Sequence, residues 1–143
     1  MKIKIKRFDK TIPLPEYKTT GSVCMDMYSR ENVTVAANSF GYIPLNVAIE
    51  VPKNYWVMLT ARSSLHKMGL IPANGIGVGD LDFSGDGDEY KLIVYNTSKN
   101  DVTIEKATRV AQIMVVRYEK TTLSEVQKLK NENRGGIGST GTK

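Results

Sequence analysis

Hydrophobic and polar residues alternate along most of the chain in short runs that end at turn residues. Lysines at positions 2, 4 and 6 alternate with Ile3 and Ile5, which predicts a half-buried strand over residues 1–7. Strand-like runs of the same kind recur at 23–28, 32–35, 42–45, 47–51, 55–60, 89–96, 101–104 and 109–118. Many short strands separated by turn signals are typical of an all-β barrel or sandwich.

Three stretches depart from simple alternation. Residues 55–60 carry apolar side chains on both sides, which predicts burial on both faces. Residues 65–68 are long enough for one helical turn, and 123–131 carry a weak helical stripe. The glycine-rich end from Arg134 cannot pack a core, so it is either a disordered terminus or a flexible segment whose backbone N–H groups wrap an anion.

The segment 74–86 combines features that point to a ligand. Ile76 and Val78 alternate with glycines, which predicts a strand with one bare face open to a ligand or another backbone. Asp80 and Asp82 follow and would point to one face of an extended chain, and Phe83 precedes a turn. The segment indicates either a site for a small planar ligand beside an acid or base, or a plain hairpin with a solvated turn.

Composition narrows the class of protein. The 143 residues suffice for one domain with a real core, and 41% hydrophobic with 24% charged content excludes wholesale disorder. The net charge of +5 is compatible with a polyanionic ligand such as a nucleotide. It is smaller than the dense positive charge expected of a nucleic-acid-binding protein.

Cysteine and histidine are scarce. With Cys24 and His66 as the sole examples of their types, neither an internal disulfide nor a classical zinc site is expected. A metal should therefore be a hard cation, namely Mg²⁺ brought by phosphates. There is no apolar run of about 18 residues and no signal-peptide pattern. We therefore expect an intracellular, cytoplasmic protein without a membrane partner.

Further segments carry groups that bind anions. Arg62-Ser63-Ser64 offers a cation and two hydroxyls at the start of the helical turn, or simply an N-cap with a surface Arg. By local sequence, Arg109 is an exposed residue at a strand start and Gln112 a sheet-edge residue. Asp26 lies between two methionines, where a buried carboxylate is costly unless it is paired or near a metal.

Taken in order, five segments resemble the five motifs of the trimeric dUTP nucleotidohydrolases, the dUTPases. These segments are 23–27, 61–65, 74–85, 108–112 and 134–141, and they span nearly the whole chain. The resemblance implies a jelly-roll-like β-barrel (β-clip) that forms a homotrimer with active sites at subunit interfaces. It divides the chain into a barrel domain at 1–126 and a flexible C-terminal lid at 127–143.

The resemblance also implies an activity and roles for residues. The reaction is Mg²⁺-assisted hydrolysis of dUTP to dUMP and pyrophosphate, which keeps uracil out of DNA and supplies dUMP for dTMP synthesis. Asp80 would activate the attacking water, Asn74 and the main chain near Gly77 would read uracil, and Phe83 would lie under the deoxyribose. Asp26 would hold water on the metal. Phosphate contacts are implied for Arg62, Ser63, Ser64, Arg109 and Gln112, and lid contacts for Arg134, Ile137, Gly138, Ser139 and Thr140.

The chain departs from the usual family pattern at several positions. Phe83 replaces a Tyr, Cys24 replaces a Gly, and Ile137 replaces a Phe that stacks on uracil. Arg134 lies closer to Ile137 than is usual, and residues 86–89 include about three extra residues. We expect a weaker lid from the lost aromatic stack.

Other functions remain open on the sequence. A dCTP deaminase on the same scaffold needs a catalytic Glu and a longer chain, and Glu89 is the one candidate near the right place. A nucleotide-sensing regulator is disfavoured by the presence of Asp80, Asp26 and the tail. A nucleic-acid-binding β-barrel fits the charge but lacks an aromatic platform, so no nucleic-acid partner is expected.

Overall fold

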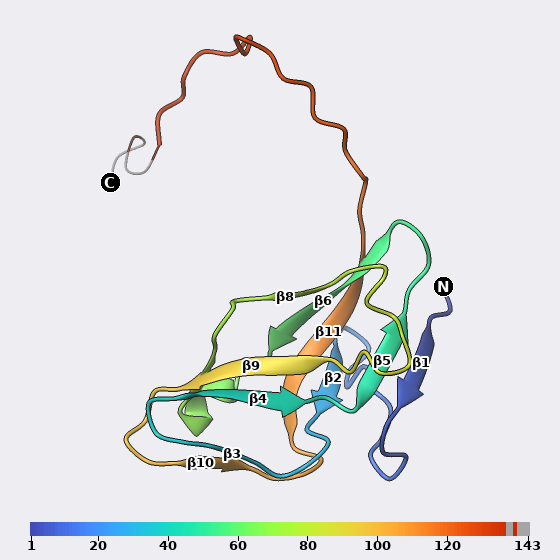
Figure 1. The fold of residues 1–143 in the computed structure, drawn as a ribbon, viewed down its shortest axis with the longest axis vertical. Helices are drawn as coiled ribbons and strands as arrows, with labels where there is room; N and C mark the ends of the chain where they lie inside the picture. Colours follow the sequence, from blue (N-terminus) through green and yellow to red (C-terminus); the bar gives the residue numbers. More distant parts are fainter. Residues whose placement is uncertain (137–138, 140–143) are drawn as a thin grey trace.

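The computed structural model describes residues 1–136 and 139 as an all-β protein, as predicted (Figure 1). Its strands are β1 (Lys4–Arg7), β2 (Met25–Tyr28), β3 (Val33–Val35), β4 (Phe40–Pro44), β5 (Val47–Glu50), β6 (Tyr55–Ala61), β7 (Leu70–Pro72), β8 (Gly77–Gly79), β9 (Lys91–Asn96), β10 (Val102–Ile104) and β11 (Arg109–Arg117). The predicted helical turn is a 3-10 helix, η1 (Leu65–Met68). Within the described residues, no helix has the length and apolar character needed to cross a membrane.

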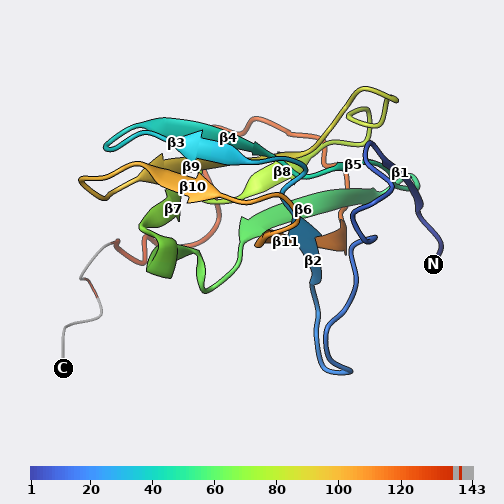
Figure 2. The same cartoon turned by 90° about the horizontal axis from the view of Figure 1, so that it is seen from below.

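The strands pair antiparallel in four small sheets. One sheet has the order β2-β11-β6-β8, a second has the order β4-β9-β7, and β1–β5 and β3–β10 form two-stranded sheets. Figure 2 shows β3, β4, β9 and β10 on one side of the body and β2, β6 and β11 on the other. A continuous apolar core that includes Met27, Ile43, Leu59, Leu92 and Ile113 fills the space between them. This arrangement is the predicted jelly-roll-like barrel.

The four-stranded sheet has a buried inner face and an outer face that is also apolar. On β6, Val57 and Leu59 are buried, whereas Trp56 and Met58 on the other side stay partly exposed, so the prediction of two buried faces is wrong for the single chain. The reason is that no layer formed by the described residues covers the outer side. The register aligns its apolar side chains across three strands, and we call them the outer apolar face: Trp56, Met58, Val78, Met114 and Val116.

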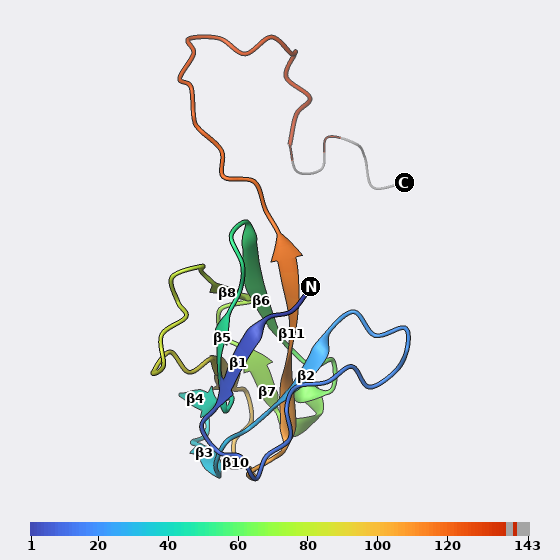
Figure 3. The same cartoon turned by 90° about the vertical axis from the view of Figure 1, so that its right-hand side faces the viewer.

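The chain beyond β11 leaves the barrel. No helix or strand forms over 118–136, and in Figures 1 and 3 this segment runs away from the body. The helix predicted over 123–131 is therefore wrong. Leu123, Val126 and Leu129 are exposed, and a short helix whose apolar stripe packs on nothing is not stable by itself.

Candidate active site

Strand β8 and the loop after it border a cavity of about 540 Å³, which we call the hairpin pocket. Its lining includes Asn74, Gly77, Asp80, Phe83 and Tyr90, and it falls in the size range of small-molecule sites. The structure thus brings together four residues that the sequence singled out. Tyr90 is an addition.

The glycines of β8 leave space that the protein itself partly fills. Gly77 pairs with Leu59 and Gly79 with Val57 of β6, so both glycines face the core side of the sheet. A Cβ at Gly77 would lie 3.2 Å from the Leu59 side chain, and one at Gly79 would overlap the phenol of Tyr90. The bare strand face predicted from the sequence is therefore covered on its inner side by Leu59 and Tyr90.

Asp80 and Asp82 do not share a strand face. Strand β8 ends at Gly79, and the Phe83 N–H donates to the Asp80 carbonyl at 3.2 Å, which closes a turn. The prediction of two carboxylates on one extended face is wrong because this turn redirects the chain. Asp80 borders the hairpin pocket, whereas Asp82 lies in a neighbouring cavity with Trp56 and Lys120, which Asp80 also borders.

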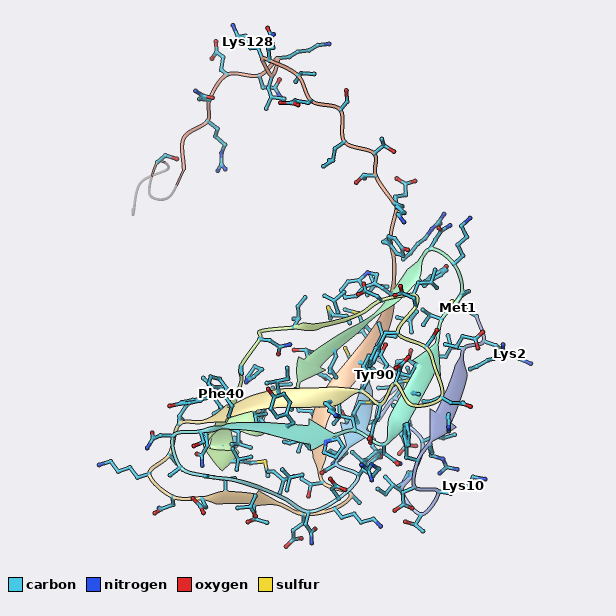
Figure 4. All side chains as sticks on the ribbon, viewed as in Figure 1. Met1, Lys2, Lys10, Phe40, Tyr90 and Lys128 are labelled. Carbon is cyan, nitrogen blue, oxygen red and sulfur yellow. The ribbon has the colours of Figure 1, made fainter. Side chains whose placement is uncertain are left out.

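Phe83 rests on a second aromatic ring inside the pocket. The centroids of Phe83 and Tyr90 are 5.2 Å apart at 87°, an edge-to-face contact. Figure 4 shows Tyr90 among the crowded side chains of the barrel, and it is 4% exposed. Burial raises the pKa of the Tyr90 hydroxyl to about 12, with the charges of Asp80 and Asp88 acting in the same direction.

The extra residues after Phe83 form a bonded loop. The Gly85 N–H donates to Asp88 Oδ2 at 2.6 Å, while Asp86 stays solvated as predicted. The Glu89 side chain is 9% exposed, and its Oε1 accepts from Arg30 Nε at 2.8 Å and from the Asn46 N–H at 2.9 Å. This Glu89 carboxylate is engaged in holding the barrel together.

A second group of predicted residues meets around Asp26, and we call Asp26, Arg62 and Arg109 the Asp26 cluster. Asp26 Oδ1 lies 3.2 Å from Arg62 Nε, and Oδ2 accepts from Arg109 Nη1 at 3.0 Å. Asp26 is buried, and the expectation that its carboxylate must be paired is confirmed. Arg109 begins β11 and is exposed, as local sequence predicts.

Gln112 and the two serines lie next to this cluster. Gln112 is opposite Asp26 in the register, and its Nε2 donates to the Ala61 carbonyl at 3.2 Å. Because β11 pairs with both β2 and β6, the sheet-edge interpretation of Gln112 is wrong. Ser63 and Ser64 precede η1, and Ser64 occupies the N-cap position without a side-chain capping bond.

The hairpin pocket and the Asp26 cluster lie toward opposite ends of β6. Gly79, just before Asp80, pairs with Val57, whereas Arg62 comes five residues later along the same strand direction. At about 3.3 Å per residue, the backbone at Arg62 lies roughly 16 Å along the sheet from the backbone beside Asp80. One protomer therefore does not bring its own Arg62 to its own Asp80.

The predicted lid residues are only partly described. Arg134 is exposed, and Ser139 is exposed with its N–H donating to the Gly136 carbonyl at 3.1 Å. Ile137, Gly138 and Thr140 lie outside the described residues.

Sequence reasoning missed Tyr90 as part of the site. Its place in the alternating set Tyr90, Leu92 and Val94 predicts a core residue, and it is buried. No signal in the local sequence could have found this role, because Tyr90 meets Gly79 only through packing between two sheets.

Comparisons with known proteins agree with this geometry. A family model described as dUTPase matches residues 10–142. The curated deoxyuridine 5'-triphosphate nucleotidohydrolase of Rickettsia bellii is 36% identical over 145 residues, covering 97% of this chain and 95% of that protein. A prophage-derived deoxyuridine 5'-triphosphate nucleotidohydrolase of Bacillus subtilis is 36% identical with 100% of both chains covered.

Solved structures share the fold. A mutant of the Staphylococcus bacteriophage 80alpha dUTPase with dUpNHpp matches with a TM-score of 0.85 at 20% identity, over 99% of both chains. The dUTPase of Streptococcus mutans matches with a TM-score of 0.75 at 21% identity, over 82% of this chain and 98% of the other.

Proposed function

This chain belongs to the dUTPase family and is thus an enzyme of the dUTP diphosphatase class, and we propose that it hydrolyses dUTP to dUMP and pyrophosphate. The observation that carries the proposal is the match to deoxyuridine 5'-triphosphate nucleotidohydrolases over the full chain, together with a pocket that gathers Asn74, Asp80 and Phe83. In a cell this reaction keeps uracil out of DNA and supplies dUMP for dTMP synthesis.

Asp80 acts as the general base. Its carboxylate borders the hairpin pocket and takes a proton from a water molecule, whose oxygen then bonds to the α-phosphorus of dUTP. The bond between that phosphorus and the bridging oxygen breaks, and pyrophosphate leaves. A positioned general base contributes about 10²- to 10⁴-fold to such a step.

The nucleoside half of dUTP occupies the hairpin pocket. Asn74 and the main chain near Gly77 supply the donors and acceptors that read uracil, and both line the cavity. Phe83, held by its edge contact with Tyr90, forms a flat apolar surface under the deoxyribose. An apolar ring beneath the sugar disfavours a 2′-hydroxyl, because that group would lose its hydrogen bonds.

The phosphate chain is bound by the Asp26 cluster and its neighbours. Arg62 and Arg109 carry the positive charge, and Ser63, Ser64 and Gln112 add hydrogen bonds to phosphate oxygens. The backbone at Arg62 lies roughly 16 Å along the sheet from the backbone beside Asp80 of the same chain, so we propose that each active site takes these two residues from different protomers. The arginines that serve one Asp80 therefore come from another protomer.

The outer apolar face supports the same assembly. Trp56, Met58, Val78, Met114 and Val116 lie on one uncovered side of the four-stranded sheet, and Val78 is 60% exposed. Aligned apolar residues of this kind mark an interaction surface, and a second copy of the chain is the occupant we propose. The result is a homotrimer with three shared sites, and the segment from Arg134 to Thr140 closes over the nucleotide.

A magnesium ion fits the residues present if it arrives with the substrate. Members of the dUTPase family generally depend on a divalent metal, and no group of three or more His, Cys, Asp or Glu suited to a metal occurs in the described part of the chain. Mg²⁺ keeps several waters and often binds through substrate phosphates, and we propose that Asp26 holds such waters. The ion supplies neutralisation of phosphate charge when bound.

A deaminase function is disfavoured by the position of Glu89. The deaminase alternative needs a free catalytic carboxylate, but the Glu89 carboxylate is partly buried and engaged with Arg30 and the Asn46 N–H. The ion pair with Arg30 gives Glu89 a structural role inside the barrel, so no catalytic role is needed to explain this residue.

Pyrophosphate release from dUTP, dCTP, dTTP and UTP, each with and without Mg²⁺, tests the proposal, with ammonia release from dCTP measured in parallel. We expect rapid Mg²⁺-dependent release from dUTP and slow release from the others. Ammonia from dCTP, or no pyrophosphate from dUTP, would refute the assignment.

A further inference from the structure

Among the described residues, a single buried side-chain polar atom has no hydrogen-bond partner, and it is Tyr90 Oη. A buried hydroxyl without a partner destabilises a fold, so its persistence calls for an explanation. The atom belongs to a residue that lines the hairpin pocket with Asp80 and Phe83. Its position at the site points to a functional use.

The surroundings of Tyr90 fix the phenol in place. Its ring and oxygen occupy the space that a side chain at Gly79 would need, directly before Asp80 in the chain. On another side the ring meets Phe83 edge-on, with 5.2 Å between centroids. The hydroxyl is therefore held next to Gly79, which precedes the proposed base Asp80. The ring that carries it contacts Phe83, which we propose lies under the deoxyribose.

The chemistry of the hydroxyl is that of a donor. A pKa raised to about 12 keeps the phenol protonated throughout the neutral range. Three acidic residues line the pocket, and two of them are engaged, since Asp88 accepts from the Gly85 N–H and Glu89 from Arg30. Among these three residues, Asp80 is the one whose carboxylate makes no hydrogen bond or ion pair within the described part of the chain, so it is the acceptor that we assign to this donor.

We propose that Tyr90 is a positioning residue whose hydroxyl donates a hydrogen bond to the Asp80 carboxylate when a nucleotide fills the hairpin pocket. The bond directs the carboxylate toward the attacking water and gives the orphaned hydroxyl its partner. The inference rests on the proposed dUTP hydrolysis and adds a residue to it. Hydrogen bonds to an ionised acceptor are short and strong, so this one can set a side-chain orientation.

Tyr90→Phe removes the hydroxyl and keeps the ring against Phe83. We expect kcat for dUTP to fall about 10- to 100-fold while KM changes less than about threefold, because Tyr90 acts through Asp80 rather than on the nucleotide. The unliganded variant should also melt at a higher temperature than the wild type. Tyr95→Phe, the same chemical change on the outer side of β9, is the matched control and should leave kcat unchanged.

A coupled variant separates positioning from packing. If Tyr90 acts through Asp80, adding Tyr90→Phe to Asp80→Asn should not lower the residual rate further. A further loss that multiplies the first, or a kcat of Tyr90→Phe within twofold of wild type, would overturn the proposal. A crystal structure with dUpNHpp should place Tyr90 Oη within about 3 Å of an Asp80 carboxylate oxygen, and a separation beyond hydrogen-bond range would also overturn it.

Failure of this inference and failure of the proposed function give different results. A wild-type protein that releases no pyrophosphate from dUTP defeats both. An active wild type and an inactive Asp80→Asn, together with a fully active Tyr90→Phe, defeat the Tyr90 assignment alone.

Discussion

The hairpin pocket and the Asp26 cluster differ in the kinds of residue that form them. The pocket is built from glycines, aromatic rings and three acidic residues, and its lining comes from the segment 74–91 together with Tyr42, Leu59 and Ile93. The cluster is built from charges brought together from β2, β11 and the end of β6, and Asp26 pairs with both arginines. In the proposed function, the hairpin pocket takes the uncharged nucleoside and the Asp26 cluster binds the phosphates.

The comparison shows that the role of an Asp side chain depends on the groups around it. Asp80 is exposed, whereas Asp26 is buried and pairs with two guanidinium groups. Asp26 keeps two like charges close together without bound phosphate, because each pairs with one of its oxygens. The two regions should therefore respond differently to mutation.

Replacing the base gives the largest expected effect. Asp80→Asn removes the proton acceptor and keeps the size of the side chain, so kcat should fall by about 10²- to 10⁴-fold. Binding of dUpNHpp, measured by calorimetry, should stay close to wild type. Normal turnover by this variant would refute the role of Asp80.

Mixing two inactive variants tests whether the two regions belong to different protomers. Arg62→Ala keeps Asp80, and Asp80→Asn keeps Arg62, so each repairs the other only across an interface. Co-refolded at equal amounts, they should regain about a quarter of the wild-type rate, because a random mixture forms that fraction of intact sites. Activity that stays at the level of the separate variants would show that each protomer works alone.

Changing Asp26 should alter metal dependence more than substrate binding. Asp26→Asn should raise the Mg²⁺ concentration for half-maximal activity by about 10- to 100-fold, because it removes the carboxylate proposed to hold the metal-bound waters. Glu50→Gln, which breaks the exposed Lys4–Glu50 pair, is the control and should not change it. An unchanged Mg²⁺ titration for Asp26→Asn would remove Asp26 from the metal site.

The pocket should make stability sensitive to alkaline pH through Tyr90. The folded-state pKa of about 12 lies above the ordinary value of 10.0, so the folded protein binds more protons between these values and loses stability as pH rises. At pH 11 the loss should be about 1 kcal/mol more for wild type than for Tyr90→Phe. Urea unfolding at pH 9 and pH 11 measures it, and equal losses in both proteins would contradict the raised pKa.

The lid should give the smallest effect. Ile137→Phe restores a ring that can stack on uracil, and we expect KM for dUTP to fall about fivefold. Steady-state kinetics measures the change, with Ile137→Leu as a control for added bulk without an aromatic face. An unchanged KM for the Phe variant would mean that residue 137 does not reach the base.

The strands were predictable because burial of one face preserves a period of two, as in Tyr90, Leu92 and Val94. Local patterns failed in two ways: a predicted element had no surface to pack on, or a turn inside the segment changed the direction of the chain. The stripe at 123–131 finds no surface to pack on, and the Asp80–Phe83 turn separates two carboxylates that an extended chain would align.

The candidate site was predictable in its residues and less so in its geometry. Asp26 between two methionines signals a paired carboxylate, but its partners Arg62 and Arg109 are distant in the chain and meet it only through sheet pairing. The role of Tyr90 depends on its packing against Gly79, whose strand belongs to a different sheet from β9, and no local pattern contains that information.

The fit between Gly79 and Tyr90 also restricts the order in which the two positions can change during evolution. A side chain gained first at position 79 would collide with the phenol, whereas a smaller residue gained first at position 90 leaves only a void. A lineage that exchanges this pair must therefore pass through a loosely packed ancestor and fill the strand afterwards.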